Sequence, residues 1–206
     1  MNFTTRKIVS HERLRKWKIP VNEDLPEIED LRNCNRRNTR EVAERAIGLS
    51  KVYLTSQNVP HSELDKSLRE FDSQYLTPKE IEFILGNRGQ TTIVQASWSI
   101  EALHTLLWSL SFFDEMTVPT TLCDVNKTIG IVRSNGLEGF FKDSLLRDQE
   151  QVLDQCDFIY RCHWAIVEME LLGVETKLVS DVVVERHRAL NWLVQGVQWD
   201  DISLDT

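Results

Sequence analysis

The sequence predicts an all-α fold, and three observations support that class. Apolar residues recur at helical spacing along most of the 206 residues, strand patterns are nearly absent, and helix-capping and helix-breaking residues are abundant. The composition, 41% hydrophobic and 27% charged, is that of a globular chain. We expect a single-domain, multi-helix bundle over residues 1–206. Residues 1–35, an N-terminal helix and an acidic loop, are expected to pack on or flank a core of residues 36–206.

The first part of the chain is expected to hold a helix, a loop and a second helix. Residues Ser10–Ile19 have the pattern of a short helix that the next residue, a proline, would end, and Pro20–Asp30 form an acidic loop. Asn38, followed three residues later by Glu41, is a capping-box pattern that starts the next helix. The sequence Asn58-Val59-Pro60 ends that helix.

Three further helices are expected in the middle of the chain. A short one begins at Ser62. Another begins at Thr77-Pro78-Lys79-Glu80, with an N-cap threonine, a proline in the first helical position and a glutamate that returns to the cap, and it ends near Gly86. The longest apolar helix is expected at about Gln90–Phe113, at the centre of the core.

The last part of the chain is expected to be helical with an ordered tail. Residues Asp124–Lys142 leave two alternatives open, because Asn126–Arg133 fits either a short helix or a strand. Three elements follow: a long helix over Arg147–Leu172, a final helix capped by Ser180 or Asp181 and running to about Val194, and an acidic tail, Gln195–Thr206, that contains Trp199.

Composition also predicts where the protein resides. Residues Met1–Lys18 carry charges throughout, unlike a secretory signal. The best apolar stretch, Ala102–Phe113, is shorter than the roughly 20 residues needed to cross a bilayer. We therefore expect a cytoplasmic protein without membrane contact. The four cysteines stand singly, with no CxxC pair, and are expected to be thiols without disulfides, several of them buried.

The charge is unevenly distributed. The formal net charge is −8, of which residues 1–60 contribute +4 and residues 61–206 contribute −12. An acidic body repels nucleic-acid phosphates, so no nucleic-acid partner is expected. A basic protein partner fits better, and the alternative is that the charge serves solubility alone.

The C-terminal stretch Glu185-Arg186-His187-Arg188-Ala189-Leu190-Asn191-Trp192-Leu193, followed by Trp199-Asp200-Asp201 and Asp205-Thr206, is a distinctive ending. It resembles a widespread bacterial domain family of unknown function, number four-two-seven-two. Other matching pieces are Ile19-Pro20-Val21-Asn22 with Leu25-Pro26, Trp98-Ser99-Ile100-Glu101 with Leu106-Leu107-Trp108-Ser109-Leu110, and Leu153-Asp154 through Asp157, Tyr160-Arg161 and His163-Trp164-Ala165. Ser109-Leu110-Ser111 departs from the family's usual Ala-Leu-Gly. The resemblance spans about residues 10–206 and implies an all-helical fold and a bacterial source, but no activity.

Ionic and aromatic residues of three helices and the tail are predicted to form a polar–aromatic cleft. They are Trp98, Glu101 and Trp108; Arg161, His163 and Trp164; Glu185, Arg186, His187, Asn191 and Trp192; and Trp199, Asp200, Asp201 and Asp205. The alternative is a structural network that fastens the tail to the bundle.

Helical spacing suggests how some of these residues pair. Glu185 and Arg188 are spaced i,i+3, and Asp157 and Arg161 are spaced i,i+4. Arg186 lies on the apolar line of its helix and needs a carboxylate, with Asp200, Asp201, Asp205 or Glu101 as suppliers.

Signals for catalysis are weak. Glu101 beside indole rings could serve as a general acid, or it could be a structural anion paired with Arg161 or Arg186. His104, His163 and His187 show no HxxxH or HExxH spacing, and no GxSxG elbow or phosphate loop is present, so no metal or cofactor is expected.

The leading hypothesis is a non-enzymatic binding protein, in one version an immunity-type protein whose acidic face neutralises a basic toxin. The alternative is a hydrolase-like enzyme that uses Glu101, His163 or His187 with Asp200 or Asp201. A third hypothesis is a structural, self-associating protein.

Overall fold

The computed structural model describes residues 3–28, 34–63, 75–86, 88–134 and 136–206. Within these ranges the secondary structure is helical, with no strand, which confirms the predicted all-α class. The contacts divide the chain into two compact units. The first unit comprises Met1–Arg37, Thr117–Leu122 and Arg147–Thr206, and the second comprises Asn38–Met116 and Cys123–Leu146. The single-domain expectation stays a prediction.

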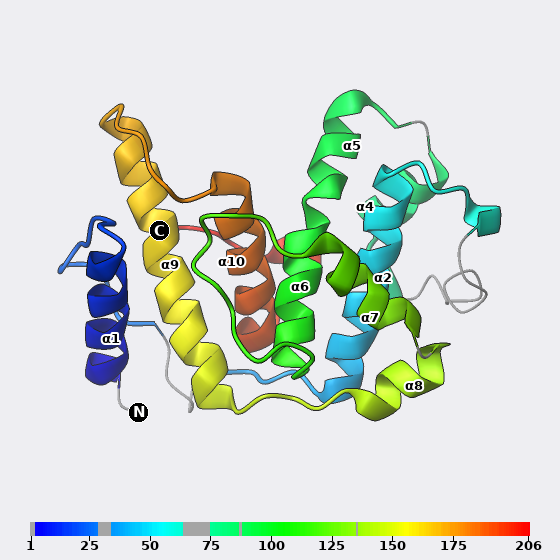
Figure 1. The fold of residues 1–206 in the computed structure, drawn as a ribbon, viewed down its shortest axis with the longest axis horizontal. Helices are drawn as coiled ribbons and strands as arrows, with labels where there is room; N and C mark the ends of the chain where they lie inside the picture. Colours follow the sequence, from blue (N-terminus) through cyan, green and yellow to red (C-terminus); the bar gives the residue numbers. More distant parts are fainter. Residues whose placement is uncertain (1–2, 29–33, 64–74, 87, 135) are drawn as a thin grey trace. The chain divides into compact units, whose positions relative to one another are not determined.

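The first unit is built on three α-helices. They are α1 (Phe3–Lys16), α9 (Gln149–Leu171) and α10 (Ser180–Gln195), and a short 3-10 helix, η3 (Trp199–Asp201), lies in the tail. Helix α9 packs against α1 on one side and α10 on the other (Figure 1). Leu14, Leu153 and Leu190 are fully buried in this unit. Residues 17–28, called the 17–28 loop below, follow α1.

The second unit is organised around α2 and α6, which form its most extensive helix pair. Its described helices are α2 (Thr39–Ser56), η1 (His61–Glu63), α4 (Pro78–Leu85), α5 (Gln90–Ser97), α6 (Ser99–Ser109), α7 (Val125–Ser134) and α8 (Gly136–Asp143). Ala46 and Ile47 of α2 and Leu103 of α6 are fully buried. The core of this unit therefore lies along these two helices.

The two predicted capping boxes are confirmed. The side chain of Asn38 accepts from the backbone N–H of Glu41 at 2.9 Å, and Glu41 returns to the Asn38 N–H at 2.8 Å. Thr77 and Glu80 make the same reciprocal pair at the start of α4. These helix starts can be predicted from the sequence because every group of a capping box lies within four consecutive residues.

The long central helix predicted over Gln90–Phe113 is wrong as a single element. The structure divides it at Trp98 into α5, which has no buried residue, and α6, which is buried along its whole length. The Ser97 and Ser99 hydroxyls donate to the carbonyls three residues before them, each at 2.6 Å. Such back-bonding competes with the helical ladder and bends helices.

The first helix also differs from its prediction. It spans Phe3–Lys16, so it begins earlier than Ser10 and ends before the proline expected to stop it. Lys18 takes a left-handed conformation with φ of 58°, and the Ile19 N–H bonds to the Leu14 carbonyl at 3.0 Å. A left-handed residue that closes the last turn is a common helix ending.

Further expectations concern the elements in the middle and at the end of the chain and the four cysteines. Residues 124–142 hold two helices, α7 and α8, so the strand alternative is wrong. The short helix expected to begin at Ser62 falls mostly on residues 64–74, which lie outside those described, and the structure gives only η1 before them. The long C-terminal helices are confirmed as α9 and α10, although Val179, not Ser180 or Asp181, occupies the N-cap of α10. No disulfide joins the cysteines, and Cys156 and Cys162 are buried as expected.

Candidate functional site

A buried ion pair on α9 begins the site of the first unit. The side chains of Asp157 and Arg161 are each 1% exposed and lie one helical turn apart. Nε and Nη2 of Arg161 donate to the two carboxylate oxygens at 2.9 and 2.8 Å. A buried guanidinium is tolerated only where a carboxylate and further hydrogen bonds replace its hydration. The i,i+4 spacing predicted this pair, and the structure confirms it.

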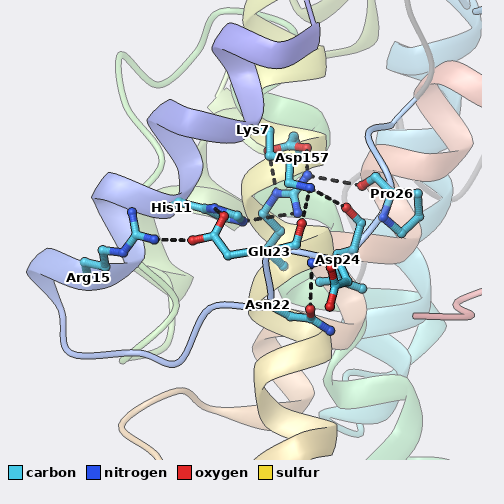
Figure 2. Close-up of polar contacts among 10 residues, drawn as sticks. Lys7, His11, Arg15, Asn22, Glu23, Asp24, Pro26 and Asp157 are labelled. Carbon is cyan, nitrogen blue, oxygen red and sulfur yellow. Dashed lines mark hydrogen bonds and ion pairs between the residues drawn. The ribbon is translucent and has the colours of Figure 1, made fainter.

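The other contacts of Arg161 hold the 17–28 loop against α9. Its Nη2 also donates to the carbonyl of Pro26 at 3.2 Å, and its Nη1 lies 3.4 Å from Nε2 of His11 on α1. The Nδ1 atom of His11 lies 3.1 Å from a carboxylate oxygen of Glu23, and Lys7 donates to two carbonyls of the loop (Figure 2). The path of the loop past α9 is therefore fixed by side chains from both helices.

His11 is held in its neutral form in this network. Burial lowers its pKa from the ordinary value, and the neighbouring Arg161 guanidinium lowers it further, although Glu23 acts in the opposite direction. A neutral ring can accept from Arg161 at Nε2 while it donates from Nδ1 to Glu23. His11 thus joins the buried cation to a carboxylate of the loop.

His163 of α9, two residues after Arg161, is in contact with His187 of α10. The Nδ1 atoms of His163 and His187 lie 2.9 Å apart, and the ring planes are nearly perpendicular, at 83°. One ring must donate and the other accept, so the pair cannot carry two protons on these atoms. Burial lowers the pKa of both, and the pKa of His187 falls to about 3 because His163 adds to the effect.

A pocket of about 210 Å³ opens beside His187. The 17–28 loop, α9, α10 and the tail each contribute to its wall, and every lining residue belongs to the first unit. The lining residues are Pro26, Glu27, Ile28, Leu153, Cys156, Tyr160, His187, Asn191, Val194, Gln195 and Asp205. Apolar and polar groups thus share one concave surface, as is usual for small-molecule sites.

His187 brings to this pocket a ring nitrogen to which none of the described residues is bonded. The residue is 2% exposed, and its Nδ1 is engaged by His163. Among the described residues, Nε2 of His187 has no hydrogen-bond partner, and the ring lines the pocket. A neutral imidazole has one donor and one acceptor nitrogen, so Nε2 of His187 is placed to exchange a hydrogen bond with a ligand in the pocket.

The pocket contains three of the residues predicted for the polar–aromatic cleft: His187, Asn191 and Asp205. Arg161 is not a lining residue, but it donates a hydrogen bond to the carbonyl of Pro26, which lines the pocket. Trp98, Glu101 and Trp108 belong to the second unit, where Glu101 is fully buried and accepts from the Cys123 N–H at 2.6 Å. The one cleft predicted from these residues stays a prediction.

The remaining predicted residues of the first unit make structural contacts. Glu185 and Arg188 form the expected i,i+3 ion pair at 2.7 Å. Arg186 is fully buried, as its position on the apolar line predicted, and it donates to the carbonyl of Thr117 at 2.8 Å, an acceptor that the sequence did not suggest. His163 is engaged by His187, and Trp164 is half-buried on α9.

The tail contacts α10 through an amide and an indole. Asn191 donates to the carbonyl of Ser203 at 3.1 Å, and the rings of Trp192 and Trp199 pack edge to face with centroids 5.8 Å apart. Asp200, Asp201 and Asp205 are exposed. These contacts bring Asp205 to the pocket wall.

Several residues of the pocket were missed by reasoning from the sequence. Pro26 and Tyr160 stood within pieces that resemble the family, and Cys156 stood in the apolar stripe of α9, but none was singled out as a site residue. Glu27 gave no signal of its own. Its place in the pocket depends on the contact between Arg161 and Pro26, which are 135 residues apart.

A family model described as a domain of unknown function, DUF4272, matches residues 6–202. The chain belongs to this family. No curated protein and no solved structure matches it significantly. The DUF4272 match takes in the pocket residues of the loop, α9 and α10 and stops short of Asp205.

Other features of the DUF4272 chain limit what the site can be. The described residues contain no group of three His, Cys, Asp or Glu side chains placed to hold a metal ion. Among the helices of the described ranges, none is long and apolar enough to cross a membrane. A second hollow, of about 450 Å³ in the second unit, is lined by Tyr53, Leu54, Val125, Asn126, Ile129, Gly130 and Arg133. It offers neither a histidine nor a carboxylate, so the first-unit pocket is the better candidate.

Proposed function

We propose that this protein is a non-enzymatic binding protein whose site is the pocket of the first unit. One observation carries the proposal. His187 is buried and lines a concave surface with a ring nitrogen that has no partner among the described residues. A ligand in the pocket could hydrogen-bond to this nitrogen, and the apolar part of the lining would bury the rest of the ligand.

The histidine and the cysteine of the pocket are held in unreactive forms. A general acid or base works best with a pKa near the working pH, and the pKa of His187 is lowered to about 3 by burial and by His163. Burial raises the pKa of the Cys156 thiol far above its ordinary value, so the nucleophilic thiolate is not formed. Both observations favour binding over the hydrolase alternative.

The proposal is tested by screening small organic fragments against the full chain with two-dimensional NMR. Fragments that bind should perturb the resonances of His187 and Tyr160, and His187→Leu should weaken their binding at least tenfold. The matched control is His104→Leu, because His104 is also a buried histidine but lies in the second unit, bonded to Thr128.

Two results would overturn the binding site. Either no fragment perturbs the pocket resonances, or His187→Leu binds the fragments as the unaltered protein does. If His187→Leu fails to fold, Tyr160→Ala takes its place, because Tyr160 is only half-buried and lines the same pocket. Turnover of any fragment would contradict the non-enzymatic part of the proposal.

The charge distribution supports a second proposal, engagement of a basic protein in the manner of an immunity protein. Residues 61–206 carry a net charge of −12, which includes the exposed carboxylates of Asp200 and Asp201 in the tail. Binding of a basic protein should then weaken steeply between low and high salt. Binding that does not respond to salt would rule this version out.

We also propose a bacterial, cytoplasmic setting. The bacterial source rests on the family resemblance. The location is supported by the four cysteines, which form no disulfide, because a reducing compartment keeps thiols unbridged.

A further inference from the structure

Among the residues that the structure describes, the charged side chains that line the first-unit pocket are acidic. Glu27 and Asp205 contribute carboxylates, and none of the described lining residues is a lysine or an arginine. His187 adds no positive charge, because it is neutral until about pH 3. The pocket therefore offers a formal charge of about −2 to whatever enters it at neutral pH.

Neither carboxylate is neutralised by a cation of the described chain. Glu27 makes no ion pair with a described residue, and Asp205 accepts from the Ser203 hydroxyl at 2.6 Å, which is a neutral donor. The two nearby guanidinium groups are committed elsewhere. Arg161 is bonded to Asp157 and to the Pro26 carbonyl, and Arg37 donates to the carbonyls of Trp192 and Val197.

The uncharged lining suits the carbon part of a small cation. Leu153 and Cys156 are buried at the pocket, and Val194 adds a third apolar group. Tyr160 supplies an aromatic ring, which attracts cations through its quadrupole. Burial raises the pKa of the Tyr160 phenol, so its hydroxyl keeps its proton and does not add charge.

Nε2 of His187, which has no partner among the described residues, can complete the recognition. When Nδ1 of His187 donates to Nδ1 of His163, Nε2 is the acceptor of the ring. An ammonium or guanidinium group has donors only, so it would select this tautomer. A carboxylate or phosphate ligand would instead meet the two carboxylates of Glu27 and Asp205.

We propose that the first-unit pocket binds a small organic cation, a primary alkylamine or alkylguanidine with a short carbon chain. The volume of about 210 Å³ sets the size, because sites for drug-sized ligands span roughly 300–1,000 Å³. The cationic head lies between Glu27, Asp205 and Nε2 of His187, and the carbon chain lies against Leu153 and Val194. This inference rests on the proposed function and names the ligand class of the same site.

The test is a titration of the full chain at pH 7.5 with four probes of similar shape. They are butylammonium, butylguanidinium, the neutral 1-pentanol and the anionic butyrate. The two cations are expected to bind at least tenfold more tightly than pentanol, with chemical-shift changes at His187, and butyrate is expected not to bind. Cation affinity should fall as salt is raised.

A double variant identifies the carboxylates responsible. Glu27→Gln with Asp205→Asn should weaken cation binding at least tenfold and leave pentanol unaffected. The matched control is Asp114→Asn with Glu138→Gln, two exposed carboxylates of the second unit, which changes the net charge by the same amount and should leave cation binding intact.

The outcomes separate this inference from the proposed function. If pentanol or butyrate perturbs the pocket as strongly as the cations do, the ligand class is wrong and the binding site stands. If the cations bind but the double variant does not weaken them, the assigned carboxylates are wrong and the inference fails. If no probe and no fragment perturbs the pocket, both the inference and the proposed function fail.

Discussion

The imidazoles of His163 and His187 share a single hydrogen bond inside the first unit, and this arrangement makes the fold sensitive to protons. His187 accepts no further proton until about pH 3, because burial and His163 lower its pKa. An unfolded histidine is protonated near pH 6.5. Below that pH, unfolding takes up a proton, so the free energy of unfolding falls as the pH falls from about 6.5 towards 3.

We therefore predict that His187→Gln flattens the pH dependence of stability between pH 5.0 and 6.5. In the unaltered protein the contribution of His187 in this window approaches about 1.4 kcal/mol per pH unit. The measurement is urea unfolding at a series of pH values. Tyr160→Phe is the control, because it alters the same pocket without removing the histidine, and it should keep the steeper slope. Equal slopes in His187→Gln and the unaltered protein would contradict the assignment.

Pairing between residues was predictable from the sequence only over short separations. The Asp157–Arg161 and Glu185–Arg188 pairs were predicted from helical spacing, because partners three or four residues apart on a helix are neighbours whatever the tertiary fold. His11 was not connected to Arg161, which lies 150 residues away. Such a contact depends on how α1 packs against α9, which no local pattern records.

At the scale of elements, the C-terminal end of α10 shows how a single position joins two distant segments. Gly196 has a φ of 71°, a left-handed conformation at the C-cap of α10. Asn35 lies against it, with its N–H bonded to the Val194 carbonyl at 2.8 Å. A Cβ on residue 196 would come within 2.7 Å of the Asn35 Cβ.

We predict that Gly196→Ala destabilises the protein by roughly 1–3 kcal/mol, because it adds left-handed backbone strain and a steric clash. The measurement is the midpoint of urea unfolding. Gly173→Ala is the matched control, since Gly173 also has a positive φ, of 65°, but open space around its Cβ position. Gly173→Ala should lower the free energy of unfolding by less than Gly196→Ala does. Equal losses of stability in the two variants would show that the contact with Asn35 is unimportant.

Elements were predictable where their ends are set locally. The capping boxes of α2 and α4 are four-residue patterns and were predicted to the residue. The break at Trp98 was not predicted, because the apolar pattern runs on through it and the two flanking serines could equally have faced solvent. The pocket was missed in part for a different reason, because its loop wall is held by contacts between residues far apart in the sequence, such as Arg161 and Pro26.

At the scale of the whole molecule, each unit is assembled from separate stretches of chain. The first unit takes Met1–Arg37, Thr117–Leu122 and Arg147–Thr206. Helical periodicity runs through these stretches and through those of the second unit alike, so the sequence predicted one continuous bundle. The tail also belongs to the first unit. Trp199 of the tail packs against Trp192 of α10 and is only 8% exposed.

We predict that deletion of residues 199–206 lowers the melting temperature. The free energy of unfolding should fall by roughly 3 kcal/mol or more, which is typical of losing a buried tryptophan. The measurement is thermal and urea unfolding. The control, Asp200→Asn with Asp201→Asn, removes two exposed charges and keeps the indole, so its stability should be nearly unchanged. An unaltered melting temperature after the deletion would refute a structural role for the tail.

The packing of α1 on α9 has a consequence for biosynthesis. Arg13 of α1 and its partner Gln155 of α9 are separated by 142 residues. At the roughly 5–20 residues per second of ribosomal synthesis, Arg13 is incorporated about 7 to 28 s before Gln155. Throughout that interval the nascent α1 has no helix to pack on, and its buried side is available to a chaperone.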